Sequence, residues 1–217
     1  MPRFPDPTRL HPITLPDGTP HEGTINLSVA LADHPNIHAG DYSYYSDPHP
    51  PSDVGDWAAR LAPYLYAGAP DHLHIGRFCQ IAAGVRFITA SANHDARALS
   101  TFPFAVFDPE RMRSFTPDIR DTTVGHDVWI GTGALICPGA QIGDGAIIGA
   151  GAVVRGTIPA YALVTGNPAR VARMRFDDAT IAKLLTLAWW NWSADRIAQA
   201  IPALMANDID ALTRCAP

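Results

Sequence analysis

The sequence predicts a mainly β fold, a parallel β-helix in which short strands stack coil upon coil. Three observations predict it. From Val124 onward the chain repeats every six residues, and each repeat begins with Ile or Val. The second residue of a repeat is usually Gly and the fifth is small. An earlier stretch that begins at Ile75 follows the same phase. A fixed short period of this kind is typical of solenoids, in which each coil contacts only its neighbours.

The residue types explain the period. A few residues make a short strand, the rest make a tight corner, and three such sides close one triangular coil. We expect the apolar first residue to point inward and to stack on its equivalent in the next coil. The small fifth residue fits inside the coil near a corner. Glycines at the second and fourth places fit corners where a Cβ atom would crowd the backbone or where φ is positive.

The period divides the chain into three segments. Residues 1–72 are expected to form an irregular segment packed on the β-helix, residues 73–166 the β-helix itself, and residues 167–217 a helical segment. Residues 93–123 break the period, and we expect them to project from a corner as a loop. Insertions of this kind often form the binding face of a solenoid. The length of this loop makes it a functional candidate.

The last segment carries helical signals. Apolar residues recur at three- and four-residue spacing after Phe176, with acidic residues at the start. Ser193 is a suitable N-cap for a second helix, although Pro202 falls inside it. A short third helix is expected near Asp208. Because the end of a solenoid needs covering, we expect these helices to form a cap over its open end.

Length and composition limit the classes of protein to which the chain can belong. A length of 217 residues with 47% hydrophobic residues suits one domain with a substantial core. The net charge of −5 and the scattered Lys and Arg residues argue against a nucleic-acid partner. No apolar run approaches the roughly 18 residues of a membrane span. The Pro-rich, polar N-terminus lacks the apolar core of a signal peptide, which favours the cytoplasm. Cys79 and Cys137 occupy solenoid positions and are expected to be core residues rather than reactive thiols.

Eight short segments then narrow the interpretation. They run in the order Tyr42-Ser-Tyr-Tyr-Ser46, Ile75-Gly-Arg-Phe-Cys79, Phe87-Ile88…Ala92-Asn-His94, Ser100-Thr-Phe-Pro-Phe104, Asp127-Val-Trp-Ile-Gly131, Gly166-Asn-Pro-Ala169, Arg175-Phe176 and Trp189-Trp-Asn-Trp192. In these segments the chain resembles the xenobiotic acetyltransferases of the hexapeptide-repeat family, which comprise the streptogramin (virginiamycin) and type B chloramphenicol acetyltransferases. The hexapeptides alone indicate only the wider acyltransferase superfamily. The loop after Asn-His and the Trp-rich segment make the resemblance more specific.

The resemblance implies a left-handed β-helix that assembles as a homotrimer with active sites between subunits. It implies acetyl-CoA as co-substrate in a cleft beside the coil, and acetyl transfer to a hydroxyl of a streptogramin- or chloramphenicol-like antibiotic or another xenobiotic. The projecting loop of one subunit would help to wall the neighbour's acceptor site. After His94 the chain reads Asp-Ala-Arg-Ala-Leu-Ser. Streptogramin enzymes usually have a Met-Asp-Gly-containing turn there, so a different acceptor pocket is expected.

The resemblance also implies that His94 is the catalytic histidine. Acetyl transfer needs a base that takes the hydroxyl proton while the oxygen attacks the thioester. Neutral imidazole has suitable basicity at pH 7, and a positioned base contributes roughly 10²–10⁴-fold. His94 could then return the proton to the departing sulfur. Its second ring nitrogen needs a hydrogen-bond acceptor, for which Asp95 is adjacent but need not face the ring. No Gly-x-Ser-x-Gly nucleophile motif is present.

Other residues are candidates for binding. For coenzyme A these are residues with free backbone groups, arginines for phosphate and neighbours of the acyl site, namely Trp129, Gly149, Ala150, Gly151, Arg155, Pro168, Arg170 and Arg173. For the acceptor they are mostly aromatic, namely Tyr44, Tyr45, Asn93 and Phe104. Ordinary packing or a solvated basic face would explain many of them equally well. No metal ion is expected.

Three other functions remain open. A sugar or other small-metabolite O-acetyltransferase would share the histidine and the co-substrate but not the acceptor. A γ-type carbonic anhydrase needs three histidines on zinc. His94 and His126 are available for that, but no histidine follows His126, and His72 and His74 lie in the wrong part of the pattern. A non-enzymatic trimeric scaffold would need only the solenoid.

Overall fold

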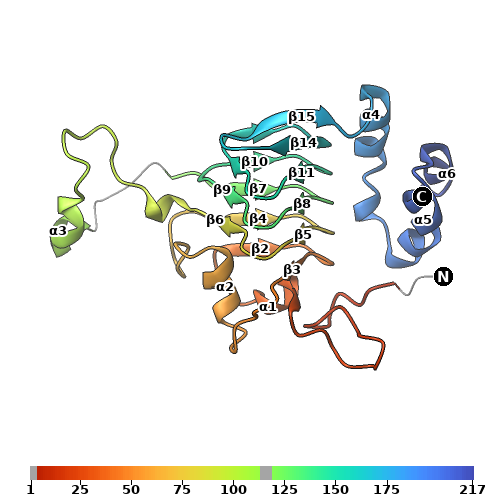
Figure 1. Cartoon of the computed structure of the whole chain (residues 1–217), viewed down its shortest axis with the longest axis horizontal. Helices are drawn as coiled ribbons and strands as arrows, with labels where there is room; N and C mark the ends of the chain where they lie inside the picture. Colours follow the sequence, from red (N-terminus) through yellow and green to blue (C-terminus); the bar gives the residue numbers. More distant parts are fainter. Residues whose placement is uncertain (1–3, 113–118) are drawn as a thin grey trace.

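The computed structural model describes residues 4–112 and 119–217, and its centre is a β-helix whose strands stack one above another (Figure 1). The strands form three sheets, one on each side of the coil. Sheet 1 contains, in spatial order, β1 (Thr24–Asn26), β3 (Tyr44–Ser46), β5 (Gln80–Ile81), β8 (Trp129–Ile130), β11 (Ile147–Ile148), β14 (Ala162–Thr165) and β15 (Arg170–Met174). Sheet 2 contains β2 (Ile37–Ala39), β4 (Leu73–Ile75), β7 (Thr122–Val124), β10 (Gln141–Ile142) and β13 (Thr157–Ile158). Sheet 3 contains β6 (Arg86–Phe87), β9 (Leu135–Ile136) and β12 (Val153–Val154).

The chain passes from sheet 2 to sheet 1, then to sheet 3 and back to sheet 2, making a corner at each passage. We call these the helix corner (residues 76–79, 125–128, 143–146 and 159–161), the glycine corner (82–85, 131–134 and 149–152) and the loop corner (88–121, 137–140 and 155–156). Strand pairing between successive coils is parallel, whereas β1 and β15 add to the two ends of sheet 1 in the antiparallel direction.

The predicted inward positions are confirmed. The first residues of successive repeats are buried, including Ile130, Ile136, Ile142, Ile148 and Val154. The small fifth residues Ala134, Ala140, Ala146 and Ala152 are completely buried. Parallel pairing holds the apolar column in line because each strand registers with the strand one coil away, as Ile130 does with Ile148.

Glycine is needed at the second and fourth places for different physical reasons. A Cβ atom on Gly131, at the second place, would lie 2.7 Å from the backbone nitrogen of Ala150 in the next coil. Gly133, at the fourth place, has nothing within 4 Å of such an atom but has φ +68°. The second place therefore needs glycine for close approach of two coils, and the fourth needs it for the left-handed backbone.

The β-helix begins inside the segment predicted to be irregular. β2 pairs with β4 and β3 pairs with β5, so residues 37–46 already make two sides of a coil. The hexapeptide period does not reveal them because a long connection separates them from the repeats. That connection contains α2 (Asp56–Leu61), whose Trp57 ring packs edge-on against the Tyr45 ring at 5.3 Å. A shorter helix, α1 (Leu27–Ala30), precedes β2.

The chain leaves the coil after β6 and returns at β7, projecting to the left in Figure 1. This excursion contains the 3-10 turns η1 (Ala90–Ala92) and η2 (Phe104–Phe107) and the helix α3 (Pro109–Met112). Residues 113–118 of the predicted loop lie outside the described residues. Several large apolar side chains of the excursion are exposed, namely Leu99, Phe102, Phe104, Phe107 and Met112.

The helical segment consists of α4 (Asp178–Leu187), the turn η3 (Trp189–Asn191), α5 (Ala194–Ala206) and α6 (Ile209–Arg214). Ser193 caps α5 as predicted, and Pro202 lies inside that helix. No helix within the described ranges is long and apolar enough to cross a bilayer.

The position of this segment differs from the predicted cap. In Figure 1 the helices stand beside the stack of coils, and β15 lies along the edge of the last coil. The Trp190 ring stacks on His126 at 5.3 Å, and the guanidinium of Arg77 donates to the Trp190 carbonyl at 2.7 Å. The outward rings of Phe78 and Tyr161 offer the apolar surface that the helices cover. The segment therefore packs along the helix corner, because that is where exposed rings would otherwise face water.

Candidate active site

His94 lies in the excursion, just after η1, with its ring exposed. Its Nδ1 atom is 2.8 Å from the carbonyl oxygen of Thr101. A carbonyl oxygen can only accept a hydrogen bond, so Nδ1 carries the hydrogen and donates it. The lone pair is then on Nε2, which is the nitrogen left to act as a base. Sequence reasoning missed this partner, because a backbone carbonyl gives no signal in the residue types.

A buried carboxylate ties the start of the excursion to the coil. The Asp71 side chain, 1% exposed, accepts a hydrogen bond from the backbone N–H of Ala90 at 2.6 Å. Asn36 holds the same segment by donating to the carbonyl oxygen of Asp71 at 2.9 Å. Because Ala90 is the first residue of η1, this anchor sets where the chain leaves the body four residues before His94. An acid preceding β4 is not distinctive in sequence, so the anchor was not predicted.

The acid next to His94 has another partner. The Asp95 carboxylate accepts from the backbone N–H of Arg97 at 2.9 Å and pairs with the Arg97 guanidinium at 3.2 Å. These bonds, the backbone one first, lower the pKa of Asp95. The Thr101 carbonyl, rather than Asp95, therefore orients the imidazole.

The four predicted acceptor residues separate into three environments. Tyr44 and Tyr45 are neighbours on β3, so their side chains point to opposite faces of sheet 1. Tyr44 faces outward and is half-buried, whereas Tyr45 is completely buried inside the coil. The prediction for Tyr45 is therefore wrong: its register with Ile81 makes it a core residue. Asn93 is half-buried beside His94, and Phe104 is 67% exposed on the excursion.

The predicted cofactor residues on the coil lie on sheet 1 and the glycine corner. Trp129 is 51% exposed on the outer face of sheet 1, in register with Ile147 of the next coil. At the glycine corner, the N–H groups of Gly149 and Gly151 already donate to the coil, at 2.8 and 2.9 Å. Among the described residues only the Ala150 N–H of these three makes no backbone hydrogen bond. Of these three N–H groups, that of Ala150 is therefore the one left to donate to a ligand.

The predicted phosphate-binding arginines are exposed. Arg170 and Arg173 lie on β15, where their guanidinium groups donate to the carbonyls of Ala169 and Met174. Within the described ranges no carboxylate forms an ion pair with either of them. Their positive charges therefore remain available to an anionic ligand.

Two other predicted cofactor residues lie near the end of the coil. Arg155 is exposed at the loop corner, and Pro168 is exposed in the turn that leads into β15. That turn runs beside β12, because the Ala169 N–H donates to the Val153 carbonyl at 2.9 Å.

Within one chain these residues belong to different parts of the coil. His94 stands at the loop corner, whereas Trp129 is on sheet 1 and Ala150 is on the glycine corner. The outer face of sheet 3 lies between the two corners.

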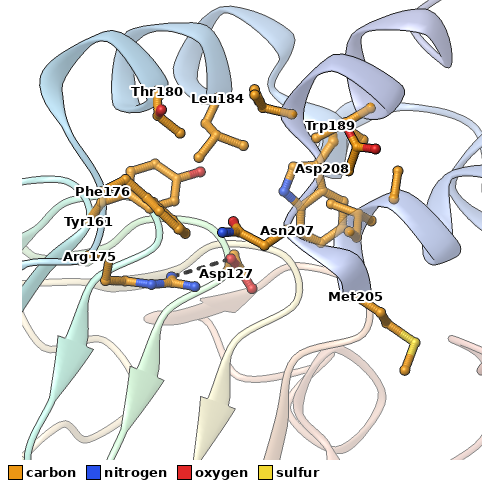
Figure 2. A pocket seen from close by; sticks show the side chains of 14 residues that line it. Asp127, Tyr161, Arg175, Phe176, Thr180, Leu184, Trp189, Met205, Asn207 and Asp208 are labelled. Carbon is orange, nitrogen blue, oxygen red and sulfur yellow. Dashed lines mark ion pairs between the residues drawn. The ribbon is translucent and has the colours of Figure 1, made fainter.

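A cavity of about 300 Å³ occurs at the helix corner, between the coil and the helices (Figure 2). The Asp127 carboxylate in its wall is 3.8 Å from the Arg175 guanidinium. Burial raises the pKa of Asp127 to about 6, although Arg175 opposes the shift. Arg175 also lies over the rings of Tyr161 and Phe176, at 5.4 and 5.2 Å. The Arg175 guanidinium also donates to the Gly145 carbonyl at 2.6 Å, so it ties the segment before α4 to the helix corner.

Comparison with known proteins agrees with this arrangement of coils. Residues 121–156 match the family model described as bacterial transferase hexapeptide (six repeats). A chloramphenicol acetyltransferase of Agrobacterium fabrum is 43% identical over 187 residues, which cover 83% of this chain and 87% of the relative. A probable macrolide acetyltransferase of Lysinibacillus sphaericus is 45% identical over 58% of this chain and 73% of the relative. A virginiamycin A acetyltransferase of Staphylococcus aureus is 38% identical over 97% of this chain and 93% of the relative. The chain therefore belongs to the hexapeptide-repeat acetyltransferases, in the group that contains the chloramphenicol and virginiamycin A enzymes.

Proposed function

We propose that this enzyme transfers the acetyl group of acetyl-CoA to a hydroxyl group of an antibiotic or a similar xenobiotic, with His94 as the general base. The single observation that carries the role of His94 is the Nδ1 bond to the Thr101 carbonyl, which leaves Nε2 basic. The choice of acceptor is supported by the relatives, which are named for chloramphenicol, macrolides and virginiamycin A.

His94 acts twice in this mechanism. Its Nε2 takes the acceptor's hydroxyl proton while the hydroxyl oxygen forms a bond to the thioester carbonyl carbon. The Thr101 carbonyl stabilises the imidazolium that results, because it already accepts from Nδ1. When the carbon–sulfur bond breaks, Nε2 returns the proton to the sulfur. Atoms and charge balance without a covalent enzyme intermediate.

Coenzyme A would lie along the glycine corner toward β15. The Ala150 N–H can donate to a pantetheine amide, and the Trp129 face can lie against the acyl end. The guanidinium groups of Arg170 and Arg173 can bind phosphate oxygens. Arg155 and Pro168 would complete the site at the last coil.

We further propose a left-handed coil and a homotrimer whose active sites lie between subunits. The excursion supports this assembly because its exposed aromatic side chains form an apolar surface that water solvates poorly. Phe102 and Phe104 lie 4.7 Å apart and Phe102 and Phe107 5.2 Å apart, and all three rings are more than half exposed. Exposed apolar clusters of this kind mark interaction sites. They also favour an apolar acceptor over a sugar, which remains the second candidate.

The test is release of coenzyme A from acetyl-CoA, followed with a thiol reagent, in the presence of different hydroxyl acceptors. The panel contains chloramphenicol, virginiamycin M, a macrolide and a simple galactoside. His94→Ala is expected to lower kcat roughly 10²–10⁴-fold with an active acceptor. His49→Ala, which alters another exposed histidine, is the matched control.

Each outcome assigns the chain differently. Release with the galactoside alone would replace the antibiotic proposal with the sugar acetyltransferase. Full activity of His94→Ala would refute the proposed base. Failure to bind acetyl-CoA would make the protein a scaffold rather than an enzyme of this type.

A further inference from the structure

Three histidines cluster on the outer face of sheet 2. They are His38 on β2, His74 on β4 and His72 just before β4. One potential ligand atom from each lies within 4.8 Å of those of the other two. The Nε2 atom of His38 and the Nδ1 atom of His72 are only 3.1 Å apart.

The fold dictates this convergence. His38 and His74 are partners in the parallel pairing of β2 with β4, so they occupy the same outward position in adjacent coils. His72 is two residues before His74, and side chains two residues apart along an extended strand share a face. The rings are nearly parallel, with interplanar angles of 14–20° and centroid separations of 4.9–5.9 Å. The cluster therefore stands on hydrogen-bonded backbone rather than on a loop.

The spacing of the ring nitrogens suits a tetrahedral ion. Zinc binds histidine nitrogen at about 2.0–2.1 Å, which places two ligand nitrogens of a tetrahedral site roughly 3.3 Å apart. The 3.1 Å pair already has this separation. The third nitrogen lies within 4.8 Å of both. Nearly parallel rings do not point their in-plane lone pairs at one ion, so binding requires the rings to turn about their broad χ2 torsions, which exposed side chains such as His74 permit.

An acidic side chain supports the cluster. The Asp121 carboxylate accepts a hydrogen bond from the backbone N–H of His72 at 2.8 Å and lies 4.0 Å from Nε2 of His74. Carboxylates beside metal-binding histidines commonly orient the rings and offset the charge of the ion. Asp121 directly precedes β7, so it comes from the third coil of sheet 2.

We propose that His38, His72 and His74 bind a zinc ion, with solvent as the fourth ligand. The proposal does not rest on the proposed acetyl transfer. In the absence of zinc, His38 and His72 share a hydrogen bond between ring nitrogens. The donor ring takes the other tautomer when zinc occupies the space between them. The ion joins β2, the first strand of sheet 2, to the beginning of β4 and so fastens the start of the β-helix.

The experiment uses the full chain without a polyhistidine tag, stripped with a chelator and titrated with zinc chloride by calorimetry. We expect one zinc ion per chain, retained through gel filtration, and a higher melting temperature with zinc. Cobalt(II) should give the visible absorption of a tetrahedral site. His38→Ala, His72→Ala and His74→Ala should each abolish stoichiometric retention. Asp121→Asn should weaken binding roughly 10–100-fold.

His49→Ala serves as the control, because it removes an exposed histidine outside the cluster. It should bind zinc like the unaltered chain. His38→Gln repeats the test with a polar side chain, should His38→Ala disturb β2. Zinc that is lost on gel filtration, or retained equally by His38→Ala and His38→Gln, would overturn the proposal and leave the three rings as a stacked surface cluster.

Discussion

Replacing Gly131 with alanine should destabilise the coil and also damage co-substrate binding. The new Cβ atom would stand 2.7 Å from the Ala150 nitrogen and 2.9 Å from the Ile148 carbonyl oxygen, both backbone atoms of the next coil. The two coils would have to separate. We expect a loss of about 1–3 kcal/mol from overpacking. Weakening the 2.7 Å bond from Gly131 N–H to Ile148 adds about 0.5–1.5 kcal/mol.

Gly133→Ala is the matched control at the same corner. Its Cβ atom meets nothing within 4 Å, so its cost is that of a left-handed backbone, about 1–2 kcal/mol. Urea unfolding at one subunit concentration would compare the two variants. The KM for acetyl-CoA should rise only in Gly131→Ala, since that change displaces the Ala150 N–H. Equal stability and equal KM in both variants would refute the close-approach explanation.

Three further predictions concern other parts of the molecule. Asp71→Asn keeps an acceptor for the Ala90 N–H but replaces the carboxylate with a neutral amide, which weakens this anchor of the excursion by about 1 kcal/mol. The measured kcat should fall several-fold, while the pH profile of kcat stays where it was. Because burial raises the pKa of Asp127 to about 6, the folded state binds more protons than the unfolded state between about pH 4 and 6. The free energy of unfolding should therefore fall as pH rises through that window. The fall is at most about 3 kcal/mol, because water partly screens a side chain that is 26% exposed. Asp127→Asn should remove this slope in thermal unfolding. Burial raises the pKa of Cys79 to about 12, so alkylation of the native protein at pH 8 should label Cys215 and spare Cys79.

The hexapeptide period predicted the core of the β-helix because it reports inward-facing positions directly. It could not predict β2 and β3, since the long segment with α2 interrupts the period before β4. It also could not place the helices, because an apolar helical face can pack on the end of a coil or on its side. In the structure Trp190 stacks on His126, which places the helices on the side of the coil.

The candidate site was predictable only where side chains carry the information. The Asn-His sequence pointed to His94, but the partner of its ring is the Thr101 carbonyl, which any residue would supply. Tyr44 and Tyr45 look equivalent in sequence, yet one register places Tyr45 inside the coil. The histidine cluster was missed because His38 joins His74 only through pairing between coils.

The separation of the corners leads to a test of where the active site lies. The excursion that carries His94 leaves the coil at the loop corner, whereas Trp129 lies on sheet 1. The proposed site therefore needs His94 of one subunit and Trp129 of another. Co-expression of His94→Ala with Trp129→Ala distinguishes the two arrangements. If each site is built within one chain, every chain in a mixed assembly carries a defect and activity stays at the level of the single variants. If the site lies between subunits, some interfaces combine an intact His94 with an intact Trp129. Activity of mixed assemblies well above that of either variant alone is therefore expected, and its absence would place the site within one chain.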